Sequence, residues 1–226
     1  MSGFAATILE MRSAPLEISL DCSGFARPQA GQYLLASCSD PGDVLPTPLF
    51  PTSPPGMEMR FAPSQPPDWY PGQRLQLRGP LGNGFSLPHG FRRLVLAALD
   101  CDPASLYPLV AQALAQAAAV TIHTAAAPAG LADDVEILPF ENLPDSLAWA
   151  DALCAALPLA SLAKFRRLAG LKVHQPFPVF AQALVFTPLA CGGWGDCGVC
   201  AVPTRQGWKL ACRNGPVFDL NLLEQP

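Results

Sequence analysis

The stretch Cys191-Gly-Gly-Trp-Gly-Asp-Cys197-Gly-Val-Cys200 decides how the C-terminal part of the chain folds. Its three cysteines lie within ten residues, and Cys212 follows after eleven intervening residues. Glycines between the cysteines let the backbone wrap around a metal centre, and the more distant cysteine can close the cage. The spacing C-x5-C-x2-C is close to the C-x4-C-x2-C of plant-type iron–sulfur proteins. We therefore expect an iron–sulfur cluster here.

Zinc is the main alternative for these four thiols. Structural zinc also binds four thiolates, but zinc ribbons usually present two C-x2-C pairs, and here only Cys197 and Cys200 form one. The spacing favours iron–sulfur over zinc, and a disulfide is the weakest reading. The remaining cysteines are scattered in apolar contexts and are expected to be small buried side chains: Cys22, Cys38, Cys101 and Cys154.

The composition indicates a globular protein with a partner. The chain has 226 residues, 50% of them hydrophobic, and only 14% are charged, against roughly 25% in average soluble proteins. Such a low charge predicts that a partner protein covers part of the surface. The net charge of −4 comes without a basic stripe, so we expect no nucleic-acid binding.

No apolar stretch approaches the roughly 18 residues that mark a membrane span. The N-terminal residues also lack the charged and apolar regions of a secretory signal. We expect a cytoplasmic protein without a membrane span.

The first third of the sequence predicts an antiparallel β-barrel. Apolar and polar residues alternate in Leu16–Leu20, Met57–Phe61 and Arg74–Arg78, each bounded by proline or glycine. Prolines are dense between residues 40 and 71, so we expect that region to be mostly connecting loop.

From residue 89 the pattern changes to alternating strands and helices. Leu94–Leu99 is an apolar run suited to a buried parallel strand, and Asp102 can cap a helix that extends to about residue 118, with a kink or a delayed start at Pro108. Val120–Thr124 and Val135–Leu138 follow as strands. A further helix is predicted near residues 147–157.

These patterns give an α+β multi-domain fold. Its parts are an N-terminal antiparallel β-barrel (residues 1–88), a central α/β domain of the nucleotide-binding type (89–171) and a small, loop-rich C-terminal module (172–226). The C-terminal module is too short for much core of its own, so its metal would stabilise it.

The sequence resembles a known family. The segments 190–201 and 208–218 resemble the cluster-binding end of the dihydroorotate dehydrogenase electron-transfer subunit, which is ferredoxin-reductase-like. Gly79–Phe85 resembles the segment that joins the flavin barrel to the nucleotide domain there. The resemblance implies a 2Fe-2S cluster held by Cys191, Cys197, Cys200 and Cys212.

The resemblance also implies an FAD-binding barrel, a nicotinamide-binding α/β domain, and a flavoprotein catalytic subunit as partner in a hetero-oligomer of pyrimidine biosynthesis. FAD is a candidate cofactor at Gly79, Pro80, Leu81 and Gly82. The arginine of the family's Arg-Pro-x-Ser motif is missing from Pro46–Pro51, however. Arg60, Arg74 or Arg78 could substitute for it, although each is more typical of a solvated strand residue. The first α/β turn, Ala97–Pro103, has no glycine and carries two aspartates, so we do not expect NAD binding.

The leading hypothesis is an electron-transfer subunit that relays electrons through the cluster and has no catalytic residues of its own. A self-contained FAD/NAD(P)H reductase and a non-redox scaffold with a structural metal are the alternatives. His89, His123 and His174 are far apart in the sequence, and none lies in a recognisable nucleophile motif.

Overall fold

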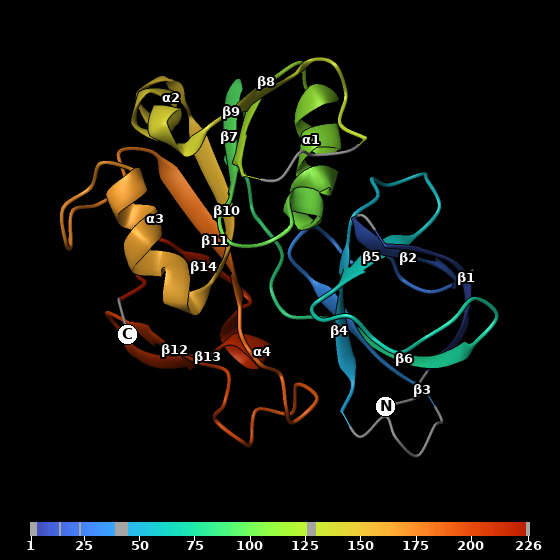
Figure 1. Cartoon of the computed structure of the whole chain (residues 1–226). Helices are drawn as coiled ribbons and strands as arrows, with labels where there is room; N and C mark the ends of the chain where they lie inside the picture. The colour runs from blue at the N-terminus through green and yellow to red at the C-terminus, as the bar shows by residue number, and fades with distance from the viewer. Residues whose placement is uncertain (1–3, 14, 23, 39–44, 126–129, 225–226) are drawn as a thin grey trace.

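The computed structural model describes residues 4–13, 15–22, 24–38, 45–125 and 130–224. A closed barrel and a six-stranded sheet lie side by side, and a two-stranded hairpin lies below the sheet in Figure 1. The ferredoxin-reductase-like arrangement predicted from the sequence is confirmed.

The N-terminal barrel has the strand order β1-β2-β5-β4-β3-β6, and all its pairs are antiparallel. Its strands are β1 (Phe4–Ser13), β2 (Leu16–Asp21), β3 (Tyr33–Cys38), β4 (Thr47–Pro51), β5 (Arg60–Pro63) and β6 (Arg74–Leu81). The alternation in β6 explains its orientation, because Leu75 and Leu77 are buried in the barrel while Arg74 and Gln76 are exposed.

The described residues 45–71 are mostly loop, as predicted, but they contain the short strands β4 and β5, and β4 is not at a sheet edge. Strand β4 lies between β3 and β5, and all five of its residues are buried. Its prolines remove single backbone donors, but Pro48 still pairs with Leu35 and Pro51 with Phe61. Burial of the apolar side chains of β4 outweighs the lost hydrogen bonds. Residues 39–44 lie outside the described part of the chain.

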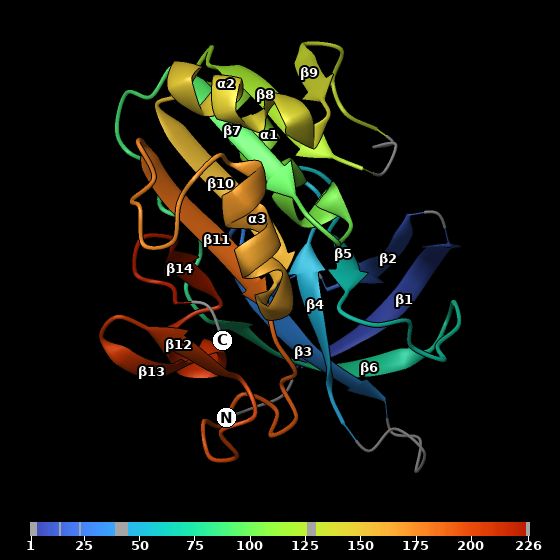
Figure 2. The ribbon, with the colours of Figure 1, turned by 60° about the vertical axis from the view of Figure 1, so that its left-hand side comes forward.

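The central sheet has the order β14-β11-β10-β7-β8-β9 and is parallel except for β14. Its strands are β7 (Arg93–Ala98), β8 (Ala119–Thr124), β9 (Val135–Leu138), β10 (Ala152–Pro158), β11 (Phe180–Phe186) and β14 (Val217–Asp219). The connecting helices are η1 (Pro103–Leu106), α1 (Tyr107–Leu114), η2 (Phe140–Asn142), α2 (Leu143–Trp149), η3 (Leu159–Ser161) and α3 (Leu162–Leu168). Figure 2 shows α3 beside β10 and β11.

Two helix predictions need correction. The helix expected near residues 147–157 is wrong, because α2 ends at Trp149 and residues 152–158 form β10. This alanine-rich run has helix propensity, but it lies at the centre of the sheet, where burial on both faces requires an apolar strand. The first helix is capped by Asp102 and its α-helical part starts late, at Tyr107 just before Pro108, as predicted, but it ends at Leu114 and not near residue 118.

The C-terminal part is shared between the sheet and a small hairpin. Strands β12 (Ala201–Thr204) and β13 (Gly207–Leu210) pair with each other, and α4 (Ala211–Asn214) follows. Strands β11 and β14 both come after the predicted boundary at residue 172, yet they belong to the central sheet. The apolar run Ala181–Val185 explains the placement of β11, because it pairs in parallel with the buried strand β10. Within the described ranges, no helix has the length and apolar character needed to cross a bilayer.

Candidate metal centre

The four cysteines of the predicted centre lie on the loop between β11 and β12 and on α4. The buried pair is Cys200 and Cys212, whose sulfur atoms are 3.4 Å apart. A backbone hydrogen bond of 2.9 Å from Ala211 to the carbonyl of Cys200 holds the two segments together. Cys200 and Cys212 are therefore in contact in the folded chain, although they lie apart in the sequence.

Cys191 and Cys197 form a second pair at the exposed end of the loop. Backbone N–H groups of Asp196 and Gly195 point at the sulfur of Cys191, and the backbone and thiol of Cys197 add to them; together they lower the pKa of Cys191 to about 6. Gly195 has a φ of +84°, a backbone conformation that glycine adopts without strain. The loop therefore places N–H donors around a sulfur atom that favours its thiolate form.

The two pairs act on each other. Burial, the neighbouring Cys200 and the charge of Cys191 together raise the pKa of Cys212 to about 12. Within the described residues, no three His, Cys, Asp or Glu side chains gather as ligands of one ion. Four thiols are the number of protein ligands that a binuclear iron–sulfur cluster takes.

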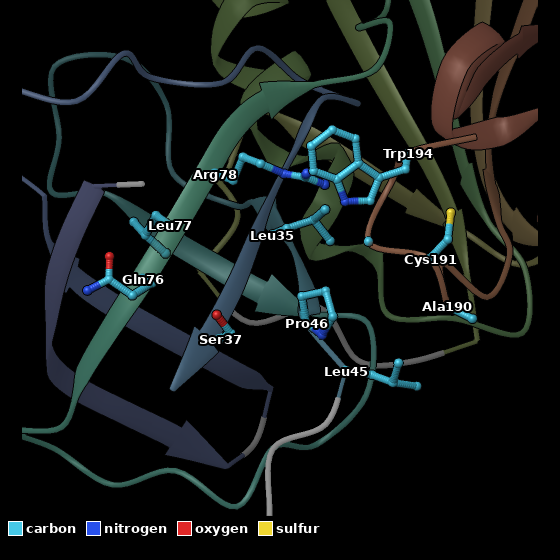
Figure 3. A pocket seen from close by; sticks show the side chains of 11 residues that line it. Leu35, Ser37, Leu45, Pro46, Gln76, Leu77, Arg78, Ala190, Cys191 and Trp194 are labelled. Atoms are coloured by element: carbon cyan, nitrogen blue, oxygen red, sulfur yellow. The ribbon is translucent and has the colours of Figure 1, made fainter. Parts of the chain in front are cut away.

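The loop that carries Cys191 lies against the barrel. A Cβ atom added to Gly193 would lie 3.2 Å from the hydroxyl oxygen of Tyr33 on β3. The same atom would lie 3.5 Å from a guanidinium nitrogen of Arg78 on β6. Arg78 also stacks on the ring of Trp194, with its guanidinium carbon 4.6 Å from the ring centroid. Figure 3 shows Arg78, Trp194 and Cys191 around a hollow of about 420 Å³ between the barrel and the loop.

Sequence reasoning missed both barrel residues. The sequence predicts Arg78 to be a solvated strand residue or a substitute for the missing arginine, and it gives Tyr33 no role at the metal centre. Neither position carries a local signal, because each reaches the loop through the closure of the barrel. Arg60 is different: it pairs with Glu17 and Glu58 on the barrel surface.

The glycine segment predicted to bind FAD is packed against the C-terminal module. A side chain on Gly82 would lie 2.5 Å from Pro216, and Gly82 has a φ of +74°. The next residue, Asn83, donates from its backbone to Gly215 at 2.6 Å and from its amide to Asn214 at 2.9 Å. The segment thus joins the barrel to the turn after α4. FAD binding by Gly79, Pro80, Leu81 and Gly82 stays a prediction.

The turn after β7 carries two aspartates and no glycine. Asp100 accepts hydrogen bonds of 2.8 Å from both Lys164 and Ser161, which lower the pKa of its carboxyl group. Asp102 caps η1, and Phe50 of the barrel packs edge-on against Phe186 at 5.2 Å. Two carboxylates at this turn repel a dinucleotide phosphate, so these residues do not fit NAD.

Comparison with known proteins agrees with this geometry. Residues 188–224 match the family described as the iron–sulfur cluster-binding domain of dihydroorotate dehydrogenase B. This match contains all four cysteines of the two thiol pairs. No curated protein matches the chain significantly.

Solved structures show the same fold over longer ranges. An NADH-dependent reduced ferredoxin–NADP oxidoreductase, studied for flavin-based electron bifurcation, is similar with a TM-score of 0.74 and 17% identity over 100% of this chain and 91% of that one. Phthalate dioxygenase reductase has a TM-score of 0.53 and 14% identity over 94% of this chain and 78% of that one. A variant ferredoxin–NADP+ reductase from Plasmodium falciparum has a TM-score of 0.59 and 10% identity over 82% and 96%.

The fold and the site together define the class. The chain has a ferredoxin-reductase-like fold. Its residues 188–224 are similar to the iron–sulfur cluster-binding domain of dihydroorotate dehydrogenase B.

Proposed function

We propose that this chain is the electron-transfer subunit of an oxidoreductase complex and that Cys191, Cys197, Cys200 and Cys212 hold its 2Fe-2S cluster. The observation that carries the proposal is the meeting of two thiol pairs inside the segment that matches a cluster-binding domain. Such a cluster takes up and releases single electrons. Backbone N–H groups around Cys191 stabilise negative charge on sulfur, while burial of Cys200 and Cys212 keeps water from one side of the centre.

The partner docks at the exposed end of the cluster loop. Cys197 is exposed, and the apolar side chains beside it are open to solvent, with Trp194 at 60% and Val199 at 53% exposure. Apolar groups at a metal centre, on a chain with few charges, support a protein interface there. A flavoprotein catalytic subunit fits this position, because the matching domain belongs to dihydroorotate dehydrogenase B.

A cytoplasmic location fits this proposal, because the cysteine ligands of a cluster must stay reduced, and thiols persist in the reducing cytoplasm.

The complex can be tested directly. The chain is purified anaerobically together with its flavoprotein partner, dihydroorotate is added, and the cluster is followed by EPR. We expect the signal of the reduced cluster in the native complex and none in a complex that carries Cys200→Ala. A loaded cluster that stays oxidised while the partner's flavin is reduced would contradict the relay.

A self-contained reductase is the second candidate, favoured by the similarity to an NADH-dependent oxidoreductase over the whole chain. Two results would support this candidate: NADH bleaches the flavin absorption of the native protein, and heat denaturation then releases FAD. A complex in which NADH leaves the absorption spectrum unchanged would exclude it.

A further inference from the structure

Tyr33 carries a buried hydroxyl group without a partner. The side chain is fully buried on β3, and its hydroxyl oxygen forms no hydrogen bond to any described protein atom. Leaving such a group unpaired in the interior costs about 1–3 kcal/mol. Ser105 is the other described residue in this state, and it lies on η1, where it lines a pocket with Asp100 and Asp102.

The hydroxyl lies against the loop that carries Cys191, Cys197 and Cys200. Its oxygen is 3.2 Å from the position that a side chain on Gly193 would take, so the cluster loop passes directly over it. Cys212, Cys200 and Cys191 all act on Tyr33 electrostatically and, together with burial, raise the pKa of its phenol. Other residues hold the ring in place. The ring of Phe50 packs against it with centroids 5.9 Å apart, and a Cβ atom added to Gly82 would lie 3.0 Å from it.

We infer that the hydroxyl of Tyr33 donates a hydrogen bond to a sulfur atom of the cluster. This inference rests on the proposed function, because it requires the cluster on these cysteines. A phenol that stays protonated can only donate to a sulfur, and hydrogen bonds to cluster sulfurs stabilise the more negative, reduced state. Tyr33 is therefore a positioning and tuning residue that raises the reduction potential of the cluster.

The barrel gains a specific role from this contact. Tyr33 belongs to β3, which is far from the cysteines in sequence, and it packs under the loop that holds three of them. The barrel would thus set the potential of a centre that the C-terminal module binds.

The test compares the native chain with Tyr33→Phe, which keeps the ring and removes only the hydroxyl group. Iron and acid-labile sulfide are counted first, and the reduction potential is then titrated anaerobically by EPR. We expect equal cluster loading and a lower potential, with the ratio of reduced to oxidised cluster falling about tenfold, or about 59 mV for a one-electron couple. Pulsed EPR in H₂O and D₂O should show an exchangeable proton near the native cluster that is absent in the variant.

Two controls separate this effect from a general disturbance. Tyr107→Phe removes a hydroxyl from α1, and Ser105→Ala removes the other unpaired one; both should leave the potential unchanged. An unchanged potential in Tyr33→Phe, or a variant that no longer loads the cluster, would overturn the inference. A native chain that binds no cluster would instead refute the proposed function, and the loading count distinguishes these two failures.

Discussion

The sulfur atoms of Cys200 and Cys212 lie 3.4 Å apart in the buried part of the C-terminal module, although eleven residues separate them in the sequence. The hairpin of β12 and β13 causes this contact. Antiparallel pairing of Ala201 with Leu210 brings the residue before β12 beside the helix after β13. The local fold therefore forms half of the metal centre from protein contacts alone.

Removing one of these thiols should abolish cluster binding. Cys212→Ala leaves three thiolates, so we expect loss of the visible absorption after anaerobic reconstitution and a module that melts earlier, because the metal stabilises it. Cys38→Ala is the matched control, since Cys38 lies on β3 outside the two thiol pairs. Full absorption in Cys212→Ala would show that another residue completes the ligand set.

The positive charge of Arg78 should tune the cluster. Arg78→Gln removes a cation next to the cluster loop, so the reduced state loses stabilisation and the potential falls. The stacking on Trp194 is also lost, which costs about 0.5–1 kcal/mol of unfolding free energy at this exposed site. Redox titration and urea unfolding measure the two effects. Arg74→Gln, an exposed arginine on the same strand, is expected to leave both unchanged.

Adding one methyl group to Gly82, which packs closely against Pro216, should lower the free energy of unfolding. Gly82→Ala introduces a carbon 2.5 Å from Pro216 and 2.8 Å from the carbonyl of Gly215, and it strains a positive φ. Gly90 has a similar φ of +72° and open space around it, so Gly90→Ala carries the strain without the clash. We expect Gly82→Ala to be less stable than Gly90→Ala by about 1–3 kcal/mol in urea unfolding. Equal stabilities would mean that the barrel and the module do not pack here as described.

His123 should make stability depend on pH. Its ring is buried and bonds to the carbonyl of Pro139 at 2.8 Å and to the hydroxyl of Ser146 at 2.9 Å. Burial lowers its pKa below the ordinary value of about 6.5, although the Pro139 carbonyl and the charge of Glu136 oppose the shift. The unfolded chain therefore binds the proton first.

Stability contributed by neutral His123 is thus complete above about pH 6.5 and is lost as the pH falls toward the folded-state pKa. His123→Gln should flatten the fall in unfolding free energy over this window, as measured by urea titrations at several pH values. Parallel curves for the variant and the native chain would rule out His123 as the titrating group.

The sequence predicted those parts of the molecule that depend on local pattern. Strict alternation in β6 and the cysteine spacing each encode their structure within a few residues. Residues 152–158 were assigned to a helix because alanine favours helices, and only the neighbouring strands β7 and β11 make this run a buried strand. Tyr33 and Arg78 reach the metal centre through barrel closure, which no short segment encodes.

The central claim is that four thiolates hold two irons at the C-terminal end of this chain. Anaerobic purification followed by iron, acid-labile sulfide and zinc analysis, with EPR after dithionite reduction, tests it most directly. We expect two irons and two sulfides per chain, and a rhombic EPR signal from one unpaired electron. A colourless protein with one zinc and no sulfide per chain would contradict the account.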